Sequence, residues 1–170
     1  MIGSVRLTLG GGDGGLTGWS LRGARSADLD GLETELSAAG SPEASEQRNG
    51  AIRVDHLVVF TPELKRTIAA LEGAGVELRR LREADEPGPP VRQAFFRLGE
   101  VILEVVEKAP AEPGSAIFWG LTFAVRDLDR CAELLGDRLG EIRDAVQPGR
   151  RIATVRRSAG LCLPVALISE

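Results

Sequence analysis

The segment RVDHLVVF, residues 53–60, contains His56, the only histidine of the 170-residue chain. An imidazole transfers protons near neutral pH and binds divalent metals, so a lone histidine is a first candidate for chemistry. Its β-branched and bulky neighbours predict a largely buried strand. Because strand side chains alternate between faces, His56 shares a face with Val58 and Phe60, and Leu57 lies on the other. The imidazole is therefore either packed among satisfied neighbours or directed at a ligand.

A second polar residue stands in the apolar run VILEVVE, residues 101–107. Strand alternation places Ile102, Glu104 and Val106 on one face, where Glu104 is the only charged group of the run. A lone carboxylate among apolar neighbours is unfavourable unless it is paired or binds a cation. His56 is the natural partner, so the sequence predicts that the two side chains converge.

From residue 52 onward the sequence predicts strands and helices in an order that occurs twice. PELKRTIAALEGAG, residues 62–75, has apolar residues at helical spacing, a proline at its start and glycines at its end, which predicts a helix. Strands are expected around it, at residues 53–60, 76–83, 91–98 and 101–106. The pattern recurs at an offset of 64 residues, where Leu57 aligns with Leu121 and Leu71 with Leu135. The sequence therefore predicts an internal duplication of a βαβββ unit.

This duplication predicts the fold class. An α+β fold is expected in which two tandem βαβββ modules, residues 52–108 and 116–169, form a shared cleft of curved sheet within a domain spanning 51–170. Residues 1–50 contain 11 of the 21 glycines and show weak periodicity. We expect them to form a largely flexible, poorly ordered N-terminal extension.

Two features of this N-terminal extension also carry predictions. Gly10, Gly12 and Gly15 match the spacing of a dinucleotide-binding fingerprint, but no helix follows them, so they are interpreted as a flexible loop. ADLDGLETELSAAG, residues 27–40, is expected to form a short helix. Neither feature predicts a function.

The composition is that of an ordinary globular protein, with 43% hydrophobic residues and a net charge of -4. Its lysines and arginines are scattered, which argues against nucleic acid as a partner. No apolar run approaches the roughly 20 residues that cross a bilayer, and the N-terminus lacks the apolar core of a signal peptide. We therefore expect a cytoplasmic protein without a membrane partner. Cys131 and Cys162, expected in a helix and a strand, are interpreted as buried small hydrophobic residues.

DHLVVFTPEL, followed about 48 residues later by ILEVVE and then by a repeat of the whole unit, resembles the vicinal oxygen chelate (VOC) superfamily. This superfamily includes glyoxalases, methylmalonyl-CoA epimerase-like proteins, extradiol dioxygenases and bleomycin-resistance proteins. The resemblance covers roughly residues 52–169. It implies a U-shaped pocket and a divalent metal ion, with one ligand on the first strand and one on the last strand of each module. His56 and Glu104 match these metal positions in module one.

Module two departs from this family pattern. His56 aligns with Gly120, and Glu104 falls opposite Pro164 or Val165, none of which has a side chain that binds metal. Two nitrogen or oxygen ligands with water make a weak site for most divalent ions. A divalent metal ion is thus one expected cofactor, with an incomplete ligand set and a degenerate site.

Three functions remain open for His56 and Glu104. In the first, a metal ion chelates vicinal oxygens of a substrate in a lyase, isomerase or dioxygenase. In the second, Glu104 orients His56 without metal, and the imidazole acts as a general base or a hydrogen-bonding anchor. In the third, the two side chains satisfy each other in a pocket that only binds. The leading prediction is a glyoxalase-like lyase or isomerase with these two catalytic residues; the alternative is a non-catalytic, sequestering small-molecule protein of the resistance kind.

Further residues are candidates for binding a small-molecule substrate. Arginines suit a carboxylate or phosphate through bidentate hydrogen bonds, and aromatic rings can form a pocket wall. The candidates are Arg92, Gln93, Phe95, Trp119, Thr122 and Arg151. Open sheet edges in such modules also favour a homodimer.

Overall fold

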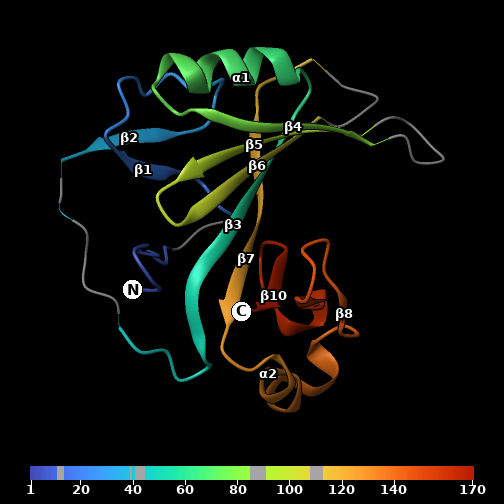
Figure 1. Cartoon of the computed structure of the whole chain (residues 1–170). Coiled ribbons are helices and arrows are strands. Elements are labelled where there is room, and N and C mark those ends of the chain that lie inside the picture. Colours follow the sequence, from blue (N-terminus) through green and yellow to red (C-terminus); the bar gives the residue numbers. More distant parts are fainter. Residues whose placement is uncertain (11–13, 39, 41–44, 85–90, 108–112) are drawn as a thin grey trace. The chain divides into compact units, whose positions relative to one another are not determined.

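The computed structural model of the chain describes residues 1–10, 14–38, 40, 45–84, 91–107 and 113–170 (Figure 1). From residue 51 onward, a strand, a helix and three strands follow one another twice. The first set is β3 (Ala51–Thr61), α1 (Leu64–Gly73), β4 (Leu78–Ala84), β5 (Val91–Leu98) and β6 (Val101–Glu107). The second is β7 (Ile117–Val125), α2 (Leu128–Leu135), β8 (Arg143–Asp144), β9 (Arg151–Thr154) and β10 (Val165–Ser169). The predicted duplication of a βαβββ unit is confirmed.

The chain divides into two compact units. Unit 1 comprises residues 1–15, 41–56 and 120–170, and unit 2 comprises residues 16–40 and 57–119. Strands β3 and β7 contribute residues to both units, because the unit boundaries fall within these strands. Each unit also draws residues from the first 50 of the chain, whereas the division into an extension and one domain at residue 51 stays a prediction. No helix in the described part of the chain is long and apolar enough to cross a membrane.

Unit 1 is built on β7, β10, β9 and β8, which are neighbours in this order. Strand β10 runs parallel to β7, with Val165 opposite Leu121, and antiparallel to β9. Helix α2 begins after Asp127, whose carboxylate accepts a hydrogen bond of 2.9 Å from the backbone N–H of Arg130. This N-cap interaction satisfies one of the free N–H groups at the helix start.

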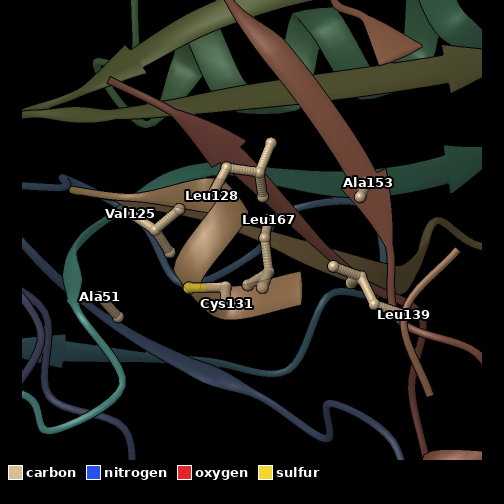
Figure 2. Close-up of a cluster of buried hydrophobic side chains, with 7 residues drawn as sticks. All are labelled: Ala51, Val125, Leu128, Cys131, Leu139, Ala153 and Leu167. Carbon is tan, nitrogen blue, oxygen red and sulfur yellow. The ribbon is translucent and has the colours of Figure 1, made fainter. Parts of the chain in front are cut away.

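The core of unit 1 contains the apolar side of α2 and residues of the neighbouring strands (Figure 2). Its buried members are Ala51, Val125, Leu128, Cys131, Leu139, Ala153 and Leu167. The prediction of a buried helical Cys131 is confirmed. For Cys162 the prediction is wrong, since this residue is exposed and lies in a bend before β10. Pro164 has no N–H to donate to a neighbouring strand, and β10 begins only at Val165.

In unit 2, β4, β5 and β6 pair antiparallel in this order. Gly99, with a φ of 64°, occupies the tight turn between β5 and β6. Helix α1 contacts β5 and β6, and its Leu64 and Leu71 are fully buried, as are Phe96 and Leu103 of these strands. The helix and strands predicted for this part of the sequence are confirmed.

The N-terminal part of unit 2 differs from its prediction. Residues 16–38, called the strap below, contain β1 (Trp19–Arg22) and β2 (Thr34–Ser37), which pair in parallel. The helix predicted over residues 27–40 is therefore wrong. Asp30 and Gly31 have left-handed φ angles of 55° and 85°, which a right-handed helix cannot accommodate. The loop predicted at Gly10 to Gly15 lies partly outside the described residues.

The strap is held to unit 2 by burial and by one aspartate. Leu29 and Leu32 are only 1% and 2% exposed. The carboxylate of Asp30 accepts hydrogen bonds from Nε of Arg66 at 2.6 Å and from the hydroxyl of Thr67 at 2.5 Å, both on α1. These contacts stabilise the left-handed backbone of Asp30, which is rare for a residue other than glycine. The described strap is thus an integral part of unit 2.

Candidate functional site

His56 lies on β3 in unit 1, and both of its ring nitrogens have partners. Nδ1 lies 3.1 Å from the carboxylate of Asp55, and Nε2 lies 2.9 Å from the hydroxyl of Thr122 on β7. Asp55 and Thr122 are each 4% exposed, and the His56 side chain is 16% exposed. Carboxylate, imidazole and hydroxyl therefore form one continuous, largely buried hydrogen-bonded chain.

Asp55 determines which nitrogen of His56 carries a proton. Burial alone would raise the pKa of the Asp55 carboxyl group, but hydrogen bonds from His56 and Arg150 outweigh it and hold the pKa well below its usual range. The ionised carboxylate only accepts hydrogen bonds, so Nδ1 of His56 donates its proton to it. In the neutral imidazole Nε2 has a lone pair, which accepts the hydroxyl proton of Thr122.

Arg150 neutralises the buried charge of Asp55. Its Nη2 donates to the Asp55 carboxylate at 2.9 Å, and its Nε donates to the backbone carbonyl of Ser169 on β10 at 2.7 Å. The guanidinium of the adjacent Arg151 donates two hydrogen bonds to the exposed Asp129 of α2. Substrate binding by Arg151 stays a prediction.

In unit 2, Gln93 and Glu104 are joined by a short hydrogen bond. Nε2 of Gln93 donates to Oε1 of Glu104 at 2.6 Å. The antiparallel register places Phe95 directly opposite Glu104 and Gln93 opposite Val106. Since residues opposite each other in a ladder point to the same side, these four side chains share one face of the sheet.

Arg92 lies on the other face of the same strand. Its Nη1 donates to Glu107 at 2.8 Å, and Oε1 of Glu107 accepts the backbone N–H of Leu64 at the start of α1. Two residues further along β5, Ala94 is fully buried and has the same orientation as Arg92. Arg92 thus positions the carboxylate that satisfies the start of α1, and its predicted role in substrate binding stays a prediction.

Trp119 is the last of the predicted substrate-binding residues. Its ring lies 5.0 Å from that of Phe60, with an interplanar angle of 40°, and Trp119 remains 43% exposed. An indole that packs against a second ring and remains partly exposed is suited to contact with an apolar ligand.

An open surface hollow of about 480 Å³ occurs in unit 2 between the strap and α1. It is lined by Asp28 and Asp30 of the strap and by Arg66, Ala69 and Gly73 of α1, among others. No residue predicted to bind substrate or metal lines it, so it is distinct from the predicted site.

No protein-family model matches this sequence, and neither does a curated protein. Solved structures do match it. The methylmalonyl-CoA epimerase from Mycobacterium tuberculosis aligns with a TM-score of 0.58 and 17% identity, over 74% of this chain and 92% of its own. A variant of the Streptomyces coelicolor methylmalonyl-CoA epimerase in complex with 2-nitronate-propionyl-CoA aligns with a TM-score of 0.54 and 20% identity, over 71% and 98% of the two chains. A methylmalonyl-CoA epimerase in complex with methylmalonyl-CoA and NH4+ aligns with a TM-score of 0.54 and 20% identity, over 69% of this chain and 94% of its own.

Methylmalonyl-CoA epimerases have the vicinal oxygen chelate fold. This chain has the VOC fold. The predicted α+β, glyoxalase-like architecture is thereby confirmed. At such low identities the likeness establishes the fold, and the activity must be argued from the site.

Proteins with the VOC fold often use a divalent metal, and the donor set described here does not fit one. Within the described ranges, no three His, Cys, Asp or Glu side chains gather closely enough to hold a metal ion. With Asp55 ionised, Nδ1 of the neutral His56 donates its proton to the carboxylate, and Nε2 then accepts the proton of Thr122. A metal ion at His56 would have to displace this hydroxyl.

Backbone packing in the second repeat explains why a glycine, Gly120, stands where the first repeat has His56. A Cβ atom built on Gly120 would lie 2.6 Å from the backbone oxygen of Pro164, and this oxygen accepts the N–H of Leu121 at 3.1 Å. The close approach of the two backbones requires a residue without a side chain. His56 of unit 1 and Glu104 of unit 2 belong to different units, so their predicted convergence stays a prediction.

Proposed function

We propose that this protein performs metal-independent acid–base chemistry on a small molecule, of the isomerase or lyase type, with His56 as the proton-transferring group. The observation that supports this is the hydrogen-bonded chain of Asp55, His56 and Thr122. A base oriented by a buried carboxylate and hydrogen-bonded to a hydroxyl is a recurring arrangement for proton transfer.

The protonation states define how such a site would work. Nε2 of His56 is the basic nitrogen, and the ionised Asp55 stabilises the imidazolium that forms when Nε2 takes a proton. The hydroxyl of Thr122 can then turn from donor to acceptor of the Nε2–H hydrogen bond.

The small-molecule class is supported by the structural neighbours. Solved epimerases of this fold are described in complex with methylmalonyl-CoA and with 2-nitronate-propionyl-CoA. Epimerisation removes a proton from carbon and returns it, which requires acid–base groups. A carbon acid next to a carbonyl is therefore the proposed substrate class.

A non-catalytic binding protein is the second candidate. It is favoured by the position of Thr122, which is 4% exposed and already occupies the basic nitrogen of His56. In that case the network would maintain the shape of a binding surface without transferring protons.

Solvent isotope exchange separates these candidates. Methylmalonyl-CoA is incubated with the protein in D2O, with and without EDTA, and deuterium at its carbon acid is followed by NMR. We expect exchange that EDTA leaves unchanged and that His56→Gln lowers by about 100-fold or more. Asp129→Asn, which alters an exposed carboxylate in the same unit, should retain it.

Three other outcomes are informative. Exchange that is abolished by EDTA, or that persists in His56→Gln, contradicts the proposed mechanism. No exchange, together with a melting temperature raised by the same compound, favours the binding protein. No exchange and no change in melting temperature contradicts both candidates for this class of ligand.

A further inference from the structure

Three arginines share the face of unit 2 that carries Phe95. On β4, Arg80 is directly opposite Phe95 and Arg82 is directly opposite Gln93, so their side chains have the same orientation as these two residues. Arg97 lies two residues beyond Phe95 on β5 and therefore also points to this face. A register shift between Leu78 and Arg80 sets this orientation, because it places two residues of β4 against one of β5.

One carboxylate, that of Glu104, shares this face with the three arginines, and it accepts a hydrogen bond from Gln93. Among the described residues, none forms a hydrogen bond or ion pair with the side chains of Arg80, Arg82 or Arg97. Their neighbours differ, since Arg79 forms an ion pair of 3.1 Å with Glu77, and Arg92 on the opposite face pairs with Glu83 and Glu107. Arginines elsewhere on β4 and β5 thus form ion pairs with described residues, whereas Arg80, Arg82 and Arg97 do not.

In the strand register, the three arginines are neighbours of one aromatic residue, Phe95. Arg80 and Arg82 start about 7 Å apart along β4, and Arg97 is a diagonal neighbour of Arg80 at about 7–8 Å. Phe95, half-buried, lies opposite Arg80 and next to Arg97 on its own strand. Like charges at this spacing repel, which disfavours the arrangement unless an anion is bound.

Protection of a sheet edge explains only part of this arrangement. In unit 2, β4 is followed by β5 in the strand order, and charged residues on an edge strand oppose pairing with other chains. Arg97, however, lies on β5, which is paired with strands on both sides. Arg82 is half-buried, so its charge is partly removed from water, and its side chain has no hydrogen bond or ion pair to a described residue.

The geometry points to a binding site for a small molecule with phosphate groups and a planar ring. Arginine forks bind phosphate oxygens in pairs, and several cations within 8 Å suit a ligand with more than one negative charge. The ring of Phe95 would stack on the planar part, as aromatic residues do with nucleobases. A nucleoside diphosphate has this chemistry. The site does not depend on proton transfer by His56, so it goes beyond the proposed function.

Isothermal titration calorimetry with ADP, inorganic pyrophosphate and adenosine tests the site on the full chain. ADP is expected to bind most tightly, pyrophosphate more weakly and adenosine weakest, with affinities for the two anions that fall as salt is raised. Arg80→Gln and Arg97→Gln should each weaken ADP about tenfold, the loss expected for one charge-assisted hydrogen bond. Phe95→Leu should weaken ADP while leaving pyrophosphate unchanged.

Arg79→Gln is the matched control, because it removes the same charge from the same strand at a residue whose guanidinium already pairs with Glu77. It should bind ADP like the parent chain. The site is overturned if ADP and pyrophosphate fail to bind at millimolar concentration, or if Arg79→Gln weakens ADP as much as Arg80→Gln. Because binding is measured and not turnover, this result is independent of isotope exchange at His56.

Discussion

Arg150 in unit 1 and Arg82 in unit 2 are both half-buried, but they differ in their hydrogen-bond partners. Arg150 donates to the buried Asp55 and to a backbone carbonyl of β10. Arg82 has no such partner among the residues that the structure describes. The first arginine completes an internal network, whereas the second presents its charge on a sheet face. Arginine thus stabilises the fold in unit 1, and in unit 2 it contributes to the proposed ligand-binding face.

The difference follows from how each charge is compensated. In unit 1 the carboxylate, imidazole, hydroxyl and guanidinium satisfy one another, and no buried side-chain nitrogen or oxygen of the described residues lacks a partner. Such a network is strongly destabilised by loss of a single member. On the face of unit 2 the arginines contribute little to folding, because their side chains have no hydrogen bond or ion pair to a described residue. Substitutions should therefore affect stability in unit 1 and ligand affinity in unit 2.

The largest expected effect is that of Asp55→Ala. It leaves Nη2 of Arg150 and the Nδ1 proton of His56 without their acceptor in a largely buried setting, which we expect to lower the free energy of unfolding by about 4 kcal/mol. Urea titration followed by circular dichroism measures this. Asp129→Ala removes the carboxylate that pairs with the neighbouring Arg151 on the surface, and it should change little. Similar midpoints for the two variants would contradict a special role for the unit 1 network.

Leu32→Ala should cause the second-largest loss in the free energy of unfolding. Leu32 is 2% exposed although it lies in the glycine-rich first 50 residues. Truncating it should cost about 3 kcal/mol through lost burial and a cavity. Leu36→Ala, at a residue that is 52% exposed in the same strap, should stay within about 0.5 kcal/mol of the parent chain. Equal stabilities of these variants would mean that the strap does not support unit 2.

The strap also shows where local sequence patterns fail to predict the structure. The elements after residue 51 were predictable because apolar periodicity, proline and glycine agreed along each segment, and the repeat supported them a second time. In the strap, local preference favoured a helix over residues 27–40. The left-handed Asp30 is stabilised by Arg66 and Thr67, more than 35 residues away, and no local pattern contains this information.

For the candidate site, too, patterns within one strand were predictable, and contacts between distant residues were not. His56 and the shared face of Gln93, Phe95 and Glu104 follow from alternation along single strands. Asp55 was missed because alternation assigns adjacent residues to opposite faces, although its carboxylate reaches the neighbouring imidazole. The pairing of Arg150 with Asp55 was not predicted, because it spans 95 residues of the sequence. The choice between Arg92 and Gln93 required the cross-strand contacts with Glu107 and Glu104.

Acidification should weaken unit 1 through Asp55. Its pKa is lowered from 3.8 on folding, so its stabilisation is fully present above that pH and is lost as the pH falls below 3.8 toward the folded pKa. The free energy of unfolding of the parent chain should therefore fall more steeply below pH 4 than that of Asp55→Asn. Urea titrations at several pH values between about 2.5 and 6 measure both slopes. Parallel slopes would show that Asp55 is not specifically stabilised as a carboxylate.

The smallest effect on stability is expected for the double variant Arg80→Gln/Arg97→Gln. These exposed side chains have no carboxylate partner among the described residues, so their loss should shift the free energy of unfolding by at most about 0.5 kcal/mol. Removing mutual repulsion should make the sign stabilising at low salt and negligible at high salt. Thermal unfolding at two ionic strengths measures this, with Arg150→Gln as the contrasting arginine. A marked destabilisation by the double variant would assign these arginines to folding, and the contrast between the two units would fail.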